Sequence, residues 1–231
     1  DAMQRQQEAR PLLQRVLDGR DKAFGPMHPD TLIALDNQSM VLGRMGKQQD
    51  AVPLSLRALE GRQTMLGRDH LETLASLHSH ALLLKSLGRH HEAAALLPRV
   101  VSSRQSILGD THPDTVLTLH SLATLLAATG QWERAEPLAQ KVREGCARLL
   151  GLGHPETLRT MRTHAELQVA LGKVDDARVT FLAILQASER LRAEEGANHP
   201  ETLTACQDIA DAHCRLGQYA AAEPFCRRAA R

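Results

Sequence analysis

The chain has 231 residues and a formal net charge of +1, because 28 Lys and Arg residues are balanced by 27 Asp and Glu residues. This balance excludes the simplest electrostatic argument for a protein that binds nucleic acids or anionic membranes. No apolar run reaches the roughly 18 residues that a membrane span needs, and the charged segment 1–10 does not resemble a signal peptide. Four cysteines without paired spacing indicate a reducing compartment, so a soluble cytoplasmic protein is the default expectation.

The composition favours helices over strands. The chain contains 37 Leu and 32 Ala, whereas Val and Ile together give 14 residues and the aromatic types only five. Leu and Ala are strong helix formers, while β-branched and aromatic residues favour strands. We therefore expect an all-α protein whose core is built from small aliphatic contacts.

One motif recurs five times along the chain, each time as His, then Pro or Leu, then Asp or Glu, then Thr. The copies begin at successive steps of 42, 42, 42 and 45 residues, at His28, His70, His112, His154 and His199. A glycine stands three residues before each histidine: Gly25, Gly67, Gly109, Gly151 and Gly196. A second glycine follows each histidine by 18 residues: Gly46, Gly88, Gly130, Gly172 and Gly217. A fixed period in this range indicates an array of structural repeats.

Each period predicts two helices joined by tight turns. The proline and the acid of the motif suit the first turn of a helix, where a missing N–H costs nothing and a negative charge meets the positive end of the dipole. The second glycine provides a left-handed stop for this first helix, and the next first glycine ends the second helix. An alanine lies near the start of the second helix of each pair, where its small size lets the two antiparallel helices approach closely. These residues are Ala51, Ala93, Ala135, Ala177 and Ala222.

In chain order, residues 1–24 are expected to be the second helix of a preceding repeat. Full repeats are then predicted over 25–66, 67–108, 109–150 and 151–195, followed by a partial repeat over 196–231. Solenoids normally end in polar capping helices, and neither end has that character. We therefore expect a single solenoid domain over 1–231 that is a fragment of a longer array.

This pattern resembles the tetratricopeptide repeat in the 42-residue form of kinesin light chain. Gly217-Gln218-Tyr219 and Gly130-Gln131-Trp132 match the family's aromatic after the turn, and Ala222-Glu223-Pro224-Phe225 matches its second-helix opening. The resemblance implies a right-handed superhelical solenoid of antiparallel helix pairs. It also implies a non-enzymatic scaffold that binds a peptide or a partner protein.

The resemblance further implies that the first helix of each pair lines a concave groove. Carried over by position, the candidate partner-binding residues are Asn37, Arg44, His78, Ser79, Lys85, His120, Ser121, Arg159, Arg162, Thr163 and Arg215. A central basic stretch is expected among them, formed by His78, Lys85, His120, Arg159 and Arg162. Arginine in such a groove would hold acidic residues of a partner by charge-assisted bonds.

No catalytic, cofactor or metal site is expected. The five motif histidines recur once per repeat, roughly 10 Å apart by helix packing, so they cannot converge on one ion. The cysteines form no CxxC pair, and Cys206 and Cys226 fall at helix-packing positions. Trp132 and Tyr219 are likewise assigned to packing, which leaves no stacking surface for nucleic acid.

Two alternatives to a groove-binding adaptor remain open from the sequence. The array could be a structural subunit that docks through its convex face or its ends. It could also be the regulatory or sensor arm of a larger multidomain protein.

Overall fold

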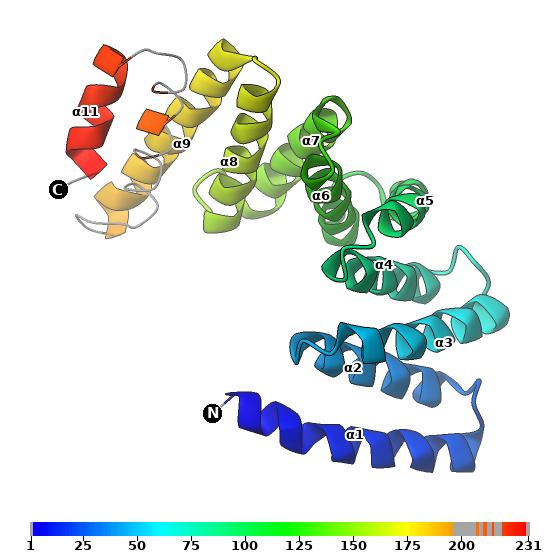
Figure 1. Ribbon diagram of the computed structural model, residues 1–231. Helices are drawn as coiled ribbons and strands as arrows, with labels where there is room; N and C mark the ends of the chain where they lie inside the picture. The colour runs from blue at the N-terminus through cyan, green and yellow to red at the C-terminus, as the bar shows by residue number, and fades with distance from the viewer. Residues whose placement is uncertain (1, 196–206, 208–209, 212–213, 215–218, 230–231) are drawn as a thin grey trace. The chain divides into compact units, whose positions relative to one another are not determined.

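The computed structural model describes residues 2–195, 207, 210–211, 214 and 219–229. These residues form helices joined by short turns and contain no β-strand, which confirms the all-α prediction. The chain divides into two compact units, Asp1–Ile107 and Leu108–Arg231 (Figure 1). The predicted repeat 196–231 lies largely outside the described residues, so its boundary stays a prediction.

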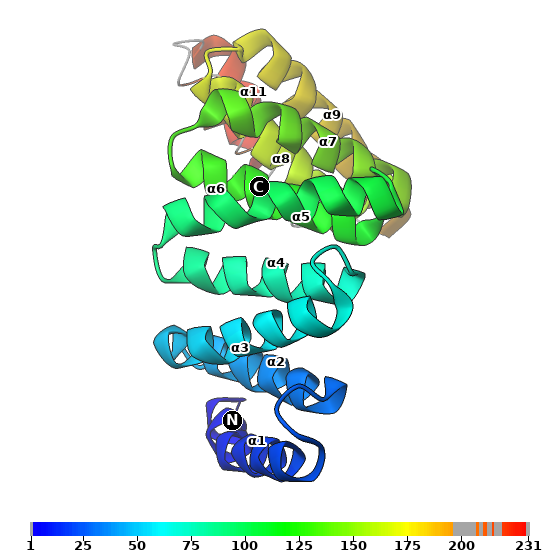
Figure 2. The ribbon, with the colours of Figure 1, turned by 90° about the vertical axis from the view of Figure 1, so that its right-hand side faces the viewer.

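Unit 1 contains five helices, whose order follows the chain (Figure 2). They are α1 (Ala2–Phe24), α2 (Pro29–Arg44), α3 (Gln48–Leu66), α4 (Leu71–Ser86) and α5 (His90–Leu108), whose last residue belongs to unit 2. The helices α1 to α4 pack consecutively, each on the next. Two buried clusters hold them together, one formed by Leu17, Leu32, Ala34, Leu35 and Ala58 and one formed by Leu59, Leu74, Leu77 and Val100.

Unit 2 repeats the same construction. Its helices are α6 (Pro113–Ala128), α7 (Trp132–Leu150), α8 (Pro155–Ala170), α9 (Val174–Glu195) and α11 (Tyr219–Ala229). The helices α6 to α9 pack consecutively. The core between α8 and α9 consists of Leu158, Met161, Ala165, Ala177, Phe181, Ile184 and Leu185, and Phe225 of α11 packs against it.

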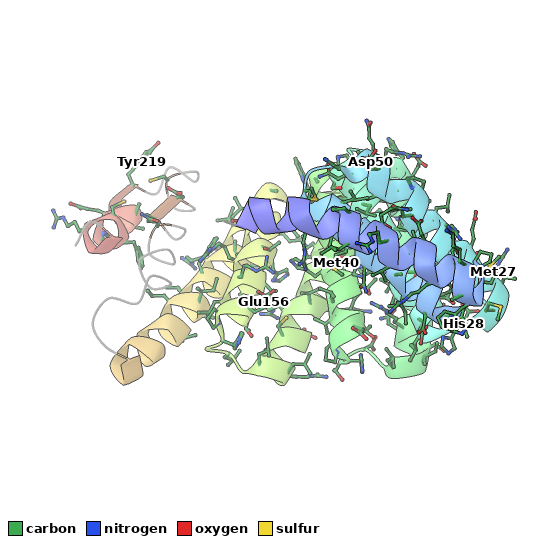
Figure 3. The ribbon with its side chains drawn as sticks, turned by 90° about the horizontal axis from the view of Figure 1, so that it is seen from below. Met27, His28, Met40, Asp50, Glu156 and Tyr219 are labelled. Atoms are coloured by element: carbon green, nitrogen blue, oxygen red, sulfur yellow. The ribbon has the colours of Figure 1, made fainter. Side chains whose placement is uncertain are left out.

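The motif histidines begin the first helix of each pair, as predicted, and they do so through the ring itself. Nδ1 of His28 accepts a hydrogen bond from the backbone N–H of Asp30 at 3.2 Å. His70, His112 and His154 make the same bond to the residue two positions on, at 3.2–3.3 Å. The ring nitrogen therefore acts as an N-cap acceptor for one of the free N–H groups of each helix. Met27 and His28 lie side by side at the start of α2 (Figure 3).

The two glycine series end the helices, which confirms both predictions. Gly46, at φ +74°, follows α2, and Gly67, at φ +89°, follows α3. Six further glycines in the equivalent places also have positive φ, where a residue with a Cβ would be strained. The turn between paired helices is thus determined locally in each repeat.

Small residues set the distance between paired helices. The repeated alanines Ala51, Ala93, Ala135 and Ala177 are fully buried. Gly61 and Gly145 are even more tightly confined, because a Cβ at either would lie 2.5 Å from a side-chain carbon of Leu32 or Val116. The close approach of antiparallel helices therefore depends on side chains of minimal size.

Three of the packing assignments made from the sequence are wrong. Trp132 and Tyr219 are 42% and 69% exposed, and Cys226 is also exposed. Trp132 and Tyr219 are the first residues of α7 and α11, where a side chain can extend past the helix end instead of entering the core. Cys206 lies outside the described residues.

Candidate functional site

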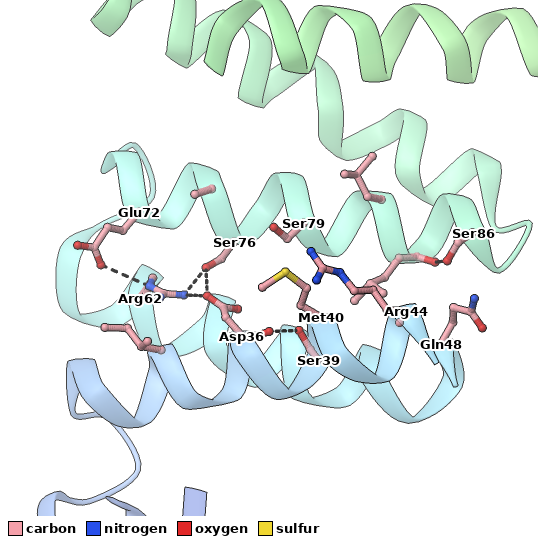
Figure 4. Close-up of a pocket in the computed structure, with 15 residues that line it drawn as sticks. Asp36, Ser39, Met40, Arg44, Gln48, Arg62, Glu72, Ser76, Ser79 and Ser86 are labelled. Atoms are coloured by element: carbon pink, nitrogen blue, oxygen red, sulfur yellow. Dashed lines mark hydrogen bonds and ion pairs between the residues drawn. The ribbon is translucent and has the colours of Figure 1, made fainter. Parts of the chain in front are cut away.

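An open hollow of unit 1 lies between the first helices of two successive repeats. Its volume is about 660 Å³, and α2 and α4 form its walls with two residues of α3 (Figure 4). We call it the α2–α4 cleft. Its lining consists of Ile33, Asp36, Ser39, Met40, Gly43, Arg44, Gln48, Arg62, Glu72, Ala75, Ser76, Ser79, Leu82, Leu83 and Ser86.

The walls of the α2–α4 cleft are largely apolar and partly open to water. Ile33, Met40 and Leu82 are exposed large hydrophobic residues that line it from opposite sides. Small residues keep the space between them open, and a Cβ on Gly43 would already approach Leu83 to 3.0 Å. Large apolar side chains exposed together in a concavity are typical of a binding site.

One end of the cleft is closed by a polar network centred on Arg62. The Arg62 side chain is buried, and its guanidinium donates hydrogen bonds to the Asp36 carboxylate and to the Ser76 hydroxyl. Ser76 in turn donates to Asp36 at 3.2 Å, and Arg62 Nε lies 3.5 Å from a carboxylate oxygen of Glu72. The network joins α2, α3 and α4. Its two acids outnumber its one arginine, so this end carries excess negative charge.

Arg44 lies farther along the cleft, and its guanidinium points back toward Met40 and Ser79 (Figure 4). This side chain is exposed. Within the part of the chain that the structure describes, no acidic side chain pairs with it. The cleft is therefore polarised, with surplus acid near Glu72 and the available Arg44 guanidinium beside Met40 and Ser79.

The predicted groove residues of unit 1 have different environments. Arg44 and Ser79 line the cleft, whereas Asn37 is exposed on α2 outside its lining. Lys85 is half-buried, and its burial lowers the pKa of its ammonium. His78 is only 5% exposed, so its side chain is packed in the protein and does not face a partner.

The predicted groove residues of unit 2 also differ in their exposure and surroundings. His120 and Arg159 line a second, smaller cavity, while Arg162 and Thr163 are half-buried. Ser121 is buried and donates its hydroxyl to the Leu117 carbonyl at 2.9 Å. Ser121 is therefore occupied within its own helix. Arg215 lies outside the described residues.

The central basic stretch expected from the sequence needs correction. His78 is buried, and the Arg159 guanidinium pairs with Glu156 one turn earlier on α8, with a hydrogen bond of 3.0 Å from Nε. The hydrogen bonds between them raise the pKa of Arg159 and lower that of Glu156, so both groups stay ionised, and their opposite charges offset each other at close contact. Of the five members, His78 is thus buried, and Arg159 is already paired with an acid.

Arg62 was missed by the groove assignment because it belongs to a second helix. A signal was present, since Arg20, Arg62 and Arg104 occupy equivalent places at steps of 42 residues.

Among the residues that the structure describes, no group of three or more His, Cys, Asp or Glu could hold a metal ion. None of the described helices is long and apolar enough to cross a membrane.

Comparisons with known proteins identify the family. The model described as tetratricopeptide repeat matches residues 2–64, 72–145 and 114–186, and a second model of that description matches 202–231. No curated protein sequence matches the chain.

Solved structures share the fold over most of their length. One such structure is of a protein from Podosopora anserina that is described as a kinesin light chain with nearly identical TPR-like repeats. Its sequence is 26% identical to this chain, and the TM-score is 0.78. The match covers 87% of this chain and 94% of that one. BtubC (BKLC) from P. vanneervenii is 17% identical with a TM-score of 0.77, over 99% of this chain and 90% of that one.

A third structure, YrrB, is described as a TPR protein with an unusual peptide-binding site. It is 13% identical with a TM-score of 0.63, and the match covers 92% of this chain and 90% of that one. Tetratricopeptide repeat proteins bind protein partners and are generally not enzymes. The chain belongs to the tetratricopeptide repeat family, and its repeats are of the kinesin light chain type.

Proposed function

We propose that the chain is a protein-interaction scaffold whose α2–α4 cleft binds a peptide segment of a partner protein. The observation that carries this proposal is the partly exposed apolar wall formed by Ile33, Met40 and Leu82, with the exposed guanidinium of Arg44 beside Met40. Burying such an apolar surface is favourable, and a charged group beside it can orient the segment that is buried.

The chemistry of the cleft indicates the kind of segment it would accept. A large apolar side chain of the peptide would lie between Met40 and Leu82. A carboxylate near it would accept hydrogen bonds from Arg44, and such charge-assisted bonds are about twice as strong as neutral ones. The excess acid near Glu72 disfavours a second carboxylate at that end, so the acidic residue and the apolar residue define one direction of binding.

The small residues along α4 support an extended or helical peptide lying close to the helix. Ala75, Ser79 and Ser86 line the cleft without filling it. YrrB, which has a similar fold, is described as having a peptide-binding site, and this is consistent with peptide binding by such an array. A helix that binds in such a groove presents apolar anchors at positions i, i+3, i+4 and i+7.

A selection from a displayed random peptide library on the purified full chain tests the proposal. We expect enriched peptides that combine a large apolar residue with a nearby Asp or Glu. Arg44→Glu should weaken binding of an enriched peptide by ten-fold or more, since a hydrogen bond to a charged group contributes about 1.5–3 kcal/mol. Lys22→Glu, on α1 and outside the cleft, is the matched control and should leave the affinity unchanged.

Equal affinity of the Arg44→Glu and Lys22→Glu variants would contradict binding in this cleft. That outcome would favour the alternatives that use other surfaces, namely a structural subunit docking through its convex face or ends, or a regulatory arm of a larger protein.

A further inference from the structure

Unit 2 contains a second cavity that the proposed function does not use. Its volume is about 370 Å³, and it lies among α6, α7 and α8. We call it the α7 cavity. It is lined by Pro113, Val116, Leu117, His120, Val142, Cys146, Leu149, Leu150, Glu156, Arg159 and Thr160.

The α7 cavity occupies the place in its repeat that is equivalent to the place of the Arg62 network in unit 1. Two periods of 42 residues relate Arg62 to Cys146, and they relate Asp36 to His120 and Ser76 to Thr160. In unit 1 the long Arg62 side chain reaches from α3 to both neighbouring helices and is held there. In unit 2 the short Cys146 side chain cannot span that distance. Replacement of the periodic arginine by cysteine therefore leaves space in the repeat.

The walls of the α7 cavity are predominantly aliphatic. Val116 and Val142 are buried, while Leu117, Leu149 and Leu150 are each more than two-fifths exposed. Three exposed leucines around one cavity leave apolar surface in contact with water. A ligand that covered them would gain the hydrophobic free energy of that surface.

The polar groups of the cavity give no advantage to an ion. Arg159 is paired with Glu156 across two hydrogen bonds, so the pair at the cavity has no net charge. Burial raises the pKa of the Cys146 thiol, which keeps it uncharged at neutral pH. The carboxylate that receives the guanidinium in unit 1, Asp36, has His120 in its place here. A charged ligand would lose its hydration without an unpaired opposite charge to meet.

We infer that the α7 cavity binds a small uncharged apolar molecule with one aromatic ring or a short alkyl chain. The inference is independent of peptide binding in the α2–α4 cleft, because it concerns a different unit and different side chains. Apolar cavities of comparable or smaller size in other proteins take up molecules of this class.

Calorimetric titration of the full chain with indole, benzoate and benzylamine tests this inference. We expect saturable binding of indole and at least ten-fold weaker binding of both charged compounds. Bound indole should also slow alkylation of Cys146 by N-ethylmaleimide, while alkylation of the exposed Cys226 continues at its original rate. Absence of indole binding, stronger binding of either charged compound, or an unprotected Cys146 would overturn the inference.

Cavity-filling variants locate the site. The double substitution His120→Asp and Cys146→Arg rebuilds the unit 1 arrangement and should abolish indole binding, as should the simpler Cys146→Leu. Cys226→Arg is the matched control and should bind indole like the original chain. Circular dichroism identifies variants that remain folded, and full indole binding by a folded Cys146→Leu variant would contradict the assignment.

Discussion

The Ser55 hydroxyl on α3 lies 2.8 Å from Nδ1 of His80 on α4, and both side chains are buried. Ser55 also donates its proton to the Val52 carbonyl at 2.9 Å. His80 Nδ1 is therefore the donor in the pair, and Ser55 Oγ accepts. The His80 ring thus links two helices through its Nδ1 proton.

The burial of His80 predicts that unit 1 loses stability in mild acid. Burial lowers the pKa of His80, with a further contribution from Arg89, so the folded protein binds its proton less readily than the unfolded chain. The unfolded chain then holds more protons below its histidine pKa of about 6.5, and stability falls as the pH drops through that value towards the folded pKa. Thermal melts from pH 8 to pH 5 should show this loss.

His80→Leu isolates the contribution of this residue, because leucine stands at the equivalent position of the next repeat, at Leu122. The variant should lose part of the decline between pH 7 and pH 5. His164 should account for another part, since its pKa is also lowered by burial. An unchanged pH profile in His80→Leu would contradict a neutral buried imidazole.

Arg62→Ala should destabilise unit 1 by about 2 kcal/mol. It leaves the largely buried carboxylate of Asp36 without its guanidinium, and such a loss usually costs more than the pair contributes. Urea denaturation measures the change. Adding Asp36→Ala should recover part of the lost stability. A double variant whose loss equals the sum of the losses of Arg62→Ala and Asp36→Ala would show that the two residues act independently.

The motif histidines should act as caps and not as ligands. His112→Ala removes the acceptor for the Asp114 N–H and should cost about 1 kcal/mol, while His112→Asn keeps a good capping side chain and should cost less. The midpoint of thermal unfolding distinguishes the two. Equal losses would mean that the ring contributes by packing alone.

Gly145→Ala and Gly19→Ala should have opposite effects. At Gly145 the new methyl group would lie 2.5 Å from Val116, so the helices must move apart, at a cost of about 1–3 kcal/mol. At Gly19, within α1, no atom lies within 4 Å of the added Cβ, and the gain in helix propensity should stabilise the protein by up to about 1 kcal/mol. Chemical denaturation of both variants tests whether close helix approach explains Gly145.

Local signals in the sequence were sufficient to predict the helix pairs. His112 with its proline and acid, and Gly130 with its positive φ, act within a few residues of themselves. The burial of His78 could not be read in this way, because it shares its repeat position with the half-buried His120 and Asp36. Its environment depends on neighbouring side chains that differ between repeats.

Only some of the residues that line the α2–α4 cleft could be named from the sequence. Arg44 and Ser79 were expected on this face, and both line the cleft. The pairing of Arg159 with Glu156 was missed because both belong to α8, and the groove assignment considered only residues at inward positions. The arginine network depends on Arg62, a residue of the helix that the groove assignment left aside.

The N-cap hydrogen bonds of the motif histidines affect how repeats can be added to the array. The helix-start hydrogen bond in each repeat joins a histidine ring to a backbone N–H two residues away, so both partners belong to the same repeat. The histidines are His28, His70, His112 and His154. An insertion of one whole period brings its own start and its own glycine stops. The array can therefore be extended by duplication without any neighbouring repeat acquiring a new signal.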